Sequence, residues 1–397
     1  MQVKPAVPRK KGRISRRAKA LSPSGIRKFF DLLASMDDGI SLGVGEPDYP
    51  TPWHIIEPAI ESLRKGQTMY TPNSGMPELR QELARHLRRE YGLDYDPESE
   101  LLITVGVSEG LDLAMRAILN PGDEVIIADP CYVSYEPCVI LAGGKTVPVP
   151  TREEDAFELS AAEVESRITD RTRAILIGYP ANPTGAVMGQ ESMRELAEVA
   201  GRHGLTVVSD EIYAKLVYGV EHTCVAALPG MQPSTILLGG FSKAYAMTGW
   251  RIGYAAAPKD IIAAMTKIHQ YTMMCAPTMA QVAAIEALRH GEESAAEMVN
   301  DYNRRRLVMV KGLRDIGLSC FEPKGAFYAF PSIRSTGMTS EEFAEGLLTE
   351  EKVVVVPGSA FGAGGEGHVR CCYATSMAEI KEALTRMRRF VRRHRRG

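Results

Sequence analysis

One stretch of the sequence surrounds a lysine and an arginine with small residues. It reads GGFSKAYAMTGWRIGYA and contains Lys243 and Arg251. Small residues let a bulky ligand approach the backbone closely. A lysine in such a pocket loses its proton easily, because burial disfavours the ammonium ion, and the neutral amine can form a Schiff base with a carbonyl. We therefore consider Lys243 as a nucleophile, beside the simpler interpretation of a surface charge.

Further polar residues follow short apolar runs that are typical of buried strands. In an open α/β sheet, ligands bind beyond the carboxyl ends of the strands. Each residue taken alone is typical of a cap, a turn or a surface group. Together these polar residues predict a binding site. The residues are Ser108, Tyr132, Asn182, Asp210, Tyr213 and Ser242, with Lys243.

Pyridoxal phosphate offers an aldehyde, a phosphate and a ring nitrogen to such a set of residues. Asp210 would pair with the protonated ring nitrogen and keep the ring an electron sink. Tyr132 could stack on the ring. Asn182 and Tyr213 could donate hydrogen bonds to its phenolic oxygen. The groups that would neutralise the phosphate are helix N–H groups, Ser108, Ser242 and Arg251.

The elements that must position these residues alternate between strands and helices. Helical patterns such as residues 190–203 separate several of the apolar runs. This alternation predicts an α/β protein whose large domain has a mostly parallel, seven-stranded sheet between helices. The predicted strands span residues 101–106, 124–129, 145–150, 173–180, 205–210, 234–240 and 252–257.

The pattern of polar and apolar residues changes after about residue 286. A long polar helix at roughly 291–315 leads to short apolar runs and a further helix, which is typical of a smaller α+β domain. At 397 residues, the chain is long enough for two domains. We predict an N-terminal arm and segment that pack with the small domain (1–45), a large cofactor-binding domain (46–290) and a small C-terminal domain (291–397).

Two familiar motifs occur in contexts that argue against their usual functions. Residues 106–110 match the G-x-S-x-G elbow of α/β hydrolases, but no oxyanion loop precedes Ser108 and no histidine has a suggestive setting. Residues 362–367 match G-x-G-x-x-G, but a strand-like segment follows instead of a helix, so we predict a glycine-rich loop.

Composition excludes several classes of function. The formal net charge is −2, which argues against nucleic acid as the main partner, and no stretch approaches the ~20 apolar residues that cross a bilayer. Seven cysteines without a C-x-x-C pair favour a reducing cytoplasm over disulfides, and neither cysteines nor histidines have metal-ligand spacing. Basic residues at both ends indicate a flexible N-terminal arm and the last turn of a C-terminal helix.

The same motifs resemble those of a known family. The stretch around Lys243 is similar to the highly specific lysine signature of the class I (class I/II) aminotransferases, which are fold-type I enzymes dependent on pyridoxal phosphate. NPTG from Asn182 and SDEIY up to Tyr213 match the family in order and rough spacing. The other similar motifs are SLGVGEPDYPTP (41–52), YTPNSGMPELR (70–80), PGSAFG (357–362) and HVRCCYA (368–374). The resemblance covers roughly residues 20–390.

The resemblance implies a role for each matching position. Lys243 would carry the cofactor and move protons, Asp210 would pair with the ring nitrogen, and Asn182 and Tyr213 would contact the phenolic oxygen. The phosphate would be held by the backbone of Val107 with Ser108, Ser242 and Arg251. Related enzymes often have tryptophan or phenylalanine where Tyr132 stands, and the position of Ser108 varies within the family.

The resemblance also implies substrates and a partner. Gly45 and Asn182 would lie near the substrate, and Arg370 would clamp its α-carboxylate. A tyrosine at the position of Tyr70 comes from the neighbouring subunit in this family and contacts the phosphate. A cytoplasmic homodimer with active sites at its interface is therefore expected.

The resemblance also indicates classes of substrate. The motifs most resemble those of archaeal and bacterial aminotransferases for aromatic amino acids or aspartate. Such an enzyme would pass the amino group to a 2-oxo acid such as 2-oxoglutarate by a ping-pong mechanism. The alternatives are an LL-diaminopimelate or alanine aminotransferase and a carbon–sulfur β-lyase. A cofactor-binding regulator is a weaker hypothesis, because about forty residues before GEPDYP are too few for a DNA-binding domain.

Overall fold

The structure is a computed structural model that describes residues 13–21 and 38–395. Most of the basic N-terminal arm, and much of the predicted 1–45 segment, lie outside the described residues. Within the described part, no helix combines the length and the apolar character that a membrane span requires.

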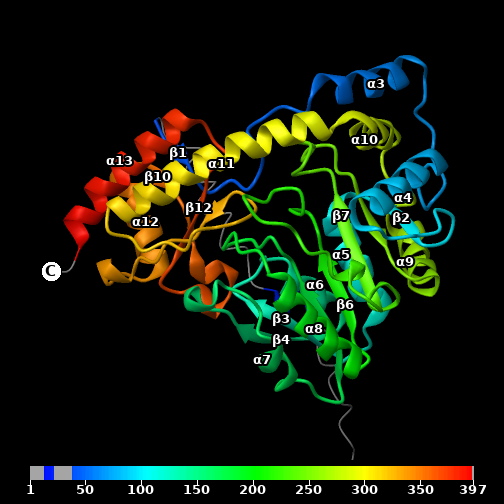
Figure 1. Ribbon diagram of the computed structural model, residues 1–397, viewed down its shortest axis with the longest axis horizontal. Coiled ribbons are helices and arrows are strands. Elements are labelled where there is room, and N and C mark those ends of the chain that lie inside the picture. Colours follow the sequence, from blue (N-terminus) through cyan, green and yellow to red (C-terminus); the bar gives the residue numbers. More distant parts are fainter. Residues whose placement is uncertain (1–12, 22–37, 396–397) are drawn as a thin grey trace, which may run out of the picture.

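A seven-stranded sheet forms the centre of the larger part of the molecule (Figure 1). Only β8 runs antiparallel to its neighbours β2 and β7, and the remaining strands are parallel to one another. The prediction of a mostly parallel sheet of seven strands is therefore confirmed. In spatial order the strands are β2 (Leu101–Thr104), β8 (Gly253–Ala256), β7 (Thr235–Gly240), β6 (Thr206–Asp210), β5 (Thr172–Ile177), β3 (Glu124–Asp129) and β4 (Lys145–Pro150).

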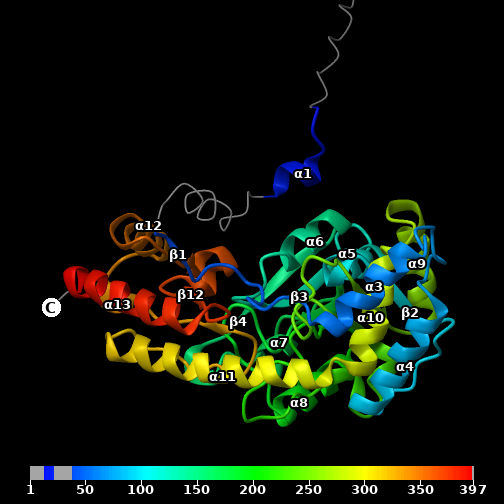
Figure 2. The ribbon, with the colours of Figure 1, turned by 90° about the horizontal axis from the view of Figure 1, so that it is seen from above.

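Helices cover both faces of this sheet (Figure 2). Alternate side chains of a strand point to opposite faces, so Val125 and Ile127 join one apolar cluster while Ile126 joins the other. The first cluster is covered by α5 (Gly106–Ile118), α6 (Tyr135–Ala142) and α9 (Lys259–Thr272), and the second by α7 (Ala161–Glu165) and α8 (Gln190–Arg202). Burial on both faces explains why the strands are apolar throughout instead of alternating.

Three further helices pack together beside the β2 end of the sheet. They are α3 (Trp53–Arg64), α4 (Pro77–Tyr91) and α10 (Thr278–His290). The short α1 (Arg16–Ala20) contacts α6. Brief 3₁₀ turns span Glu153–Asp155, Val225–Ala227, Gln232–Ser234, Arg334–Thr336, Gly358–Phe361 and Ala363–Gly365.

The C-terminal elements form a smaller α+β unit, as the sequence predicts. The long helix α11 (Glu292–Asp315) runs from α10 to this unit, where it packs on α13 (Figure 1). A small antiparallel sheet has the order β11 (Val356–Pro357), β12 (Val369–Cys372) and β9 (Tyr328–Ala329). The short strand β1 (Ile40–Ser41) pairs in parallel with β10 (Val353–Val354), and the unit is completed by α12 (Ser340–Glu351) and α13 (Met377–His394).

The second glycine motif forms a loop. The 3₁₀ turns at residues 358–365 are followed by residues 366–368 and then by strand β12, and no helix begins after Gly367 before that strand. Gly364 donates its N–H to Oδ1 of Asp129 at 2.9 Å, which fixes the loop against the end of β3. The interpretation of this motif as a loop is confirmed.

Candidate active site

The carboxyl ends of the parallel strands open into one cavity of about 560 Å³. Because β2, β3, β5, β6 and β7 run in the same direction, the segments that follow them meet at the same edge of the sheet. Eleven of the predicted site residues line the cavity: Gly45, Val107, Ser108, Tyr132, Asn182, Asp210, Tyr213, Ser242, Lys243, Arg251 and Arg370. Tyr70 lies outside this lining, and the residue is 80% exposed.

Lys243 stands just beyond β7, in the turn that the glycine- and serine-rich sequence allows. Its Nζ donates a hydrogen bond to the carbonyl oxygen of Gly45 at 2.5 Å and lies 5.7 Å from the ring centre of Phe327. Burial lowers the pKa of Lys243 to about 8. A larger fraction of the amine than in an ordinary lysine is therefore neutral and nucleophilic near physiological pH, although the protonated form still predominates.

Asp210 ends β6 and is buried. Burial raises the pKa of this carboxyl group to about 6, although hydrogen bonds from the backbone of Ile212 and from Tyr135 oppose the effect, as does the charge of Lys243. The carboxylate is thus largely ionised at neutral pH. It is placed to hold a cationic nitrogen in the same cavity as the lysine.

The first turn of α5 and Arg251 form an anion cradle. Gly106 begins the helix with φ +73°, and a Cβ there would lie 2.8 Å from a terminal nitrogen of Arg251. Only glycine therefore permits this close approach. The N–H groups of the first helical turn, beside Val107 and Ser108, have no partners within the helix and attract anions. Ser242 lines the same cavity from the β7 side.

Arg370 projects from β12 and is buried. Its two terminal nitrogens donate to Oδ1 of Asn182 at 2.8 Å and to the carbonyl oxygen of Gly43 at 2.6 Å. Its guanidinium carbon lies 4.4 Å from the ring centre of Tyr328. The Nε atom has no hydrogen-bond partner among the described residues. A buried donor of this kind is suited to a carboxylate ligand.

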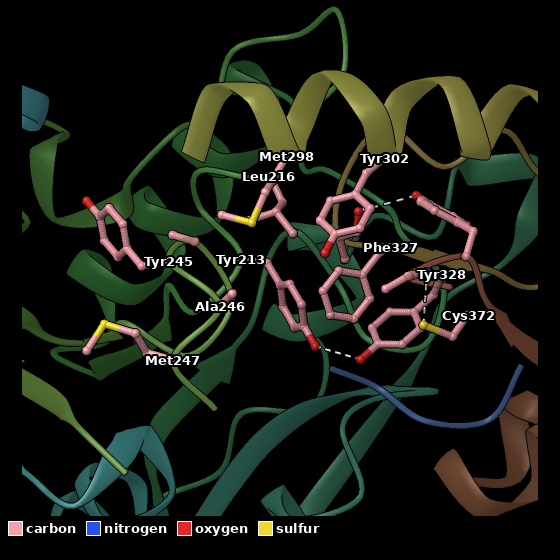
Figure 3. Close-up of a cluster of buried hydrophobic side chains, with 14 of the residues drawn as sticks. Tyr213, Leu216, Tyr245, Ala246, Met247, Met298, Tyr302, Phe327, Tyr328 and Cys372 are labelled. Carbon is pink, nitrogen blue, oxygen red and sulfur yellow. Dashed lines mark hydrogen bonds between the residues drawn. The ribbon is translucent and has the colours of Figure 1, made fainter. Parts of the chain in front are cut away.

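Two tyrosines lie between Phe327 and this arginine in the cavity. The hydroxyl groups of Tyr213 and Tyr328 are 2.6 Å apart, and the two side chains point toward each other (Figure 3). Phe327 packs edge-on against both rings. Gly45 leaves room for the Tyr328 hydroxyl group, which would lie 2.4 Å from a Cβ at that position.

Sequence reasoning missed several residues that line the cavity: Glu46, Tyr135, Gly178, Thr248 and Tyr328. Tyr135 follows the predicted residue Tyr132 by three positions and begins α6, so the nearby pair of tyrosines is a signal that could have found it. Thr248 donates to a carboxylate oxygen of Glu46 at 3.1 Å. This contact joins segments that are 202 positions apart, and no local pattern indicates it.

One group outside the cavity has the ligand types of a metal site. Among the described residues, His86, Glu90 and Glu292 bring their ligand atoms close together. The ammonium group of Lys215 lies 3.3 Å from Glu90 and 2.7 Å from Glu292, so a lysine already neutralises these carboxylates. The group is better explained as an ion-pair network that joins α4 to α11.

Comparison with known proteins decides which family has this cavity. The sequence matches the family Aminotransferase class I and II over residues 37–387. The chain belongs to this family. A Bacillus subtilis protein assigned to the aminotransferases is 56% identical over 371 residues, 94% of this chain and 96% of that relative. An aspartate aminotransferase of Pyrococcus abyssi is 47% identical over 382 residues, 96% of this chain and 98% of that relative.

A solved structure extends the likeness to the fold. An aromatic aminotransferase from Pyrococcus horikoshii has 46% sequence identity and a TM-score of 0.88, with 92% of this chain and 99% of that chain covered. The fold is therefore that of the fold-type I aminotransferases, and the protein is an aminotransferase that uses pyridoxal phosphate. The interpretation of G-x-S-x-G as something other than a hydrolase elbow agrees with this family.

The residues present fit that cofactor. The anion cradle at Gly106 and Arg251 suits a phosphate, and the buried carboxylate of Asp210 suits a ring cation. Lys243 supplies an amine of lowered pKa in the same cavity. The three chemical features of pyridoxal phosphate thus each have a matching group.

Proposed function

We propose that the residues converging on this cavity hold pyridoxal phosphate in the roles that their chemistry suits. Lys243 would bind its aldehyde carbon, Asp210 its ring nitrogen, and Asn182 and Tyr213 its phenolic oxygen, with Tyr132 stacked on the ring. The phosphate would be held by the backbone of Val107 with Ser108, Ser242 and Arg251. When bound, the cofactor supplies an electron sink for the bond broken at the substrate α-carbon.

The convergence of Lys243, Asp210 and Arg370 on one cavity is the observation that carries this proposal. The neutral amine of Lys243 takes the proton from the substrate α-carbon and returns it as a general acid. Its pKa of about 8 lies close enough to neutral pH for both steps. Arg370 orients the substrate through its α-carboxylate, with Asn182 and Gly45 beside it.

We propose an aromatic amino acid or aspartate as the amino donor and a 2-oxo acid such as 2-oxoglutarate as the acceptor. The names of the two Pyrococcus relatives, one an aspartate and one an aromatic aminotransferase, support this choice. The donor product leaves before the acceptor binds, so the kinetics are ping-pong.

The active enzyme is proposed to be a homodimer in which Tyr70 reaches the neighbouring site. Five exposed apolar side chains support this arrangement: Met69, Tyr70, Tyr271, Met273 and Met274. Hydrogen bonds from Asn73 to Met274 and from Thr278 to Met69 bring the two segments together, so we call this set the methionine patch. Contiguous exposed apolar surface of this kind marks a protein interface.

The domain boundaries and the cellular location are also proposals. The pairing of β1 with β10 and the start of α11 at Glu292 support the division into residues 1–45, 46–290 and 291–397, with the first segment packed on the small domain. The seven cysteines are all free, which supports a reducing cytoplasm.

A panel of L-amino acids with 2-oxoglutarate tests the substrate proposal. The purified enzyme with its cofactor should turn over phenylalanine, tyrosine or aspartate with the highest kcat/KM, and double-reciprocal plots should give parallel lines. Faster turnover of alanine or LL-diaminopimelate would show that the donor is wrong. Release of pyruvate from cystathionine without an acceptor would instead show a β-lyase.

Replacement of the lysine tests the chemical role. Lys243→Ala should abolish transamination, and mass spectrometry after borohydride reduction should find no cofactor attached to the variant chain. Lys215→Ala is the matched control, because Lys215 is not part of the cavity lining and pairs with Glu90 and Glu292 instead, and it should keep both properties. Transamination by the Lys243 variant would contradict the assignment.

A further inference from the structure

Asp210 is held by a tyrosine that the proposed roles do not use. Tyr135 lies at the start of α6 and is buried. Its hydroxyl group donates to Oδ2 of Asp210 at 3.0 Å, while Oδ1 accepts the N–H of Ile212 at 3.2 Å. Each carboxylate oxygen therefore has one fixed donor, and the plane of the carboxylate is set from two sides.

Close neighbours restrict the position of the Tyr135 hydroxyl group. Gly178, which follows β5, passes so close that a Cβ there would lie 2.1 Å from that hydroxyl oxygen and 3.5 Å from Cβ of Asp210. The Tyr135 ring meets Tyr132 edge-on, with ring centres 5.6 Å apart. The same tyrosine thus contacts both the ring-stacking residue and the carboxylate.

The charged groups that face Asp210 define its electrostatic setting. Lys243 favours the ionised carboxylate and Glu211 opposes it. Glu211 is itself paired with His222 and accepts a hydrogen bond from Ser209 at 2.7 Å, which limits its repulsion. The raised pKa of Tyr135, caused first by burial, keeps its phenol protonated, so it acts toward Asp210 as a donor.

We propose that Tyr135 is a positioning residue that keeps the proton shared by Asp210 and the cofactor ring nitrogen on the nitrogen. The inference rests on the proposed pairing of Asp210 with that nitrogen. A hydrogen bond donated to a carboxylate stabilises its charged form and makes it a weaker base. Loss of the donor lets the carboxylate take the proton, and the ring then withdraws electrons less strongly.

The location of the proton can be measured directly by ¹⁵N NMR. The enzyme is loaded with pyridoxal phosphate labelled at the ring nitrogen. The native enzyme should give a resonance near the pyridinium position. In Tyr135→Phe, which keeps the ring and removes one oxygen, the resonance should move toward that of neutral pyridine. The value of kcat should fall by about tenfold, the size expected for one hydrogen bond to a charged group.

Two further variants separate the inference from the pairing on which it rests. Asp210→Asn should give the full neutral-pyridine resonance, and if it does not, the pairing itself is wrong. If Asp210→Asn shifts the resonance and Tyr135→Phe does not, only the role of Tyr135 is overturned. Tyr179→Phe is the matched control, since it removes a buried phenol that donates to the carbonyl oxygen of Phe157 at 2.9 Å, and it should leave the resonance in place.

A substitution at a second residue tests the same hydrogen bond if the Tyr135→Phe variant does not fold. Gly178→Ala should push the Tyr135 hydroxyl group away from Asp210 and shift the ¹⁵N resonance in the same direction. An unshifted resonance in a folded Gly178→Ala enzyme would count against the proposal as strongly as one in Tyr135→Phe.

Discussion

Burial acts in opposite senses on the two ionisable groups at the centre of the cavity. It lowers the pKa of Lys243 to about 8 and raises that of Asp210 to about 6. The two values bracket neutral pH, so the amine readily loses its proton there while the carboxylate has already lost its own. Both shifts disfavour a charge in the cofactor-free protein, and the active site therefore costs stability.

Replacement of Lys243 by methionine should make the cofactor-free protein more stable, because it removes the buried amine. The pKa of the lysine is lowered on folding, so the unfolded chain binds more protons between about pH 8 and the ordinary lysine value of about 10.4. The destabilisation is complete below pH 8 and is lost as the pH rises through this window. Lys243→Met should raise the free energy of unfolding of the cofactor-free protein by up to about 3 kcal/mol at pH 7.

Urea unfolding at fixed protein concentration measures the effect. The difference between the variant and the native protein should shrink from pH 8 to pH 10.5. Lys215→Met is the control. Lys215 bridges the carboxylates of Glu90 and Glu292, so its loss should lower the free energy of unfolding. A stabilisation by Lys243→Met that does not depend on pH would show that the amine is not the source.

The residues that the sequence predicted and those that it missed differ in a physical way. Asp210 ends a strand and Asn182 and Lys243 follow strands, and parallel strands bring their carboxyl ends together whatever the loops do. Tyr328 reaches the cavity through contacts with Tyr213 and Arg370, which come from distant segments. Such contacts depend on packing between elements, and neither motif nor periodicity carries that information.

At the scale of elements, ion pairs fasten the C-terminal helix to its neighbour. Glu351 ends α12 and is buried, and it accepts hydrogen bonds from Arg389 and Arg393 of α13. Burial alone would raise the pKa of Glu351, but these two guanidinium groups outweigh it and hold the pKa below its ordinary value. The basic C-terminus predicted to suit a helix dipole thus also makes specific contacts.

Replacement of Glu351 by glutamine should loosen this contact. The folded-state pKa is lowered, so the stabilisation is present above the ordinary glutamate pKa of about 4.3 and is lost as the pH falls through the folded value. Glu351→Gln should cost about 1–3 kcal/mol at pH 7 and progressively less below pH 4, measured by thermal or urea unfolding.

An ion pair within α13 whose carboxylate is more exposed provides the comparison. Glu382 pairs with Arg386 one turn later at 2.8 Å, and half of its side chain is exposed. Glu382→Gln should change the free energy of unfolding by less than about 0.5 kcal/mol, because solvent screens such pairs. Equal effects of the two substitutions would show that burial of Glu351 does not strengthen its contacts.

Element boundaries show where sequence patterns stop being informative. The strands at 124–129 and 145–150 have the predicted bounds, since turn residues close both ends. The strand predicted at 101–106 ends at Thr104 because Gly106 already begins α5. The run of valines at residues 353–356 divides into β10 and β11, which pair with different partners. A continuous apolar run does not reveal such a change of partner.

At the scale of the whole molecule, the described chain leaves one apolar surface uncovered. The methionine patch lies on segments 69–70 and 271–274, and Tyr271 has 86% of its side chain exposed. Tyr70 belongs to the same surface and not to the cavity lining of its own chain. An interface there would bury the patch and bring Tyr70 to the cavity of the partner subunit. In a two-fold symmetric dimer, the same contact would occur twice, once at each cavity.

Mixed dimers decide whether Tyr70 serves its own subunit or the partner. Lys243→Ala and Tyr70→Ala subunits, each inactive or impaired alone, are co-expressed with different tags and the hybrid is isolated. If Tyr70 crosses the interface, both defects fall in one site of the hybrid and the other site is intact. The hybrid should then regain about half of the native kcat. If Tyr70 acts within its own chain, each site has one defect and no activity returns. Light scattering on each sample checks that the proposed dimer forms. A failure to regain activity then points to the position of Tyr70 and not to dissociation.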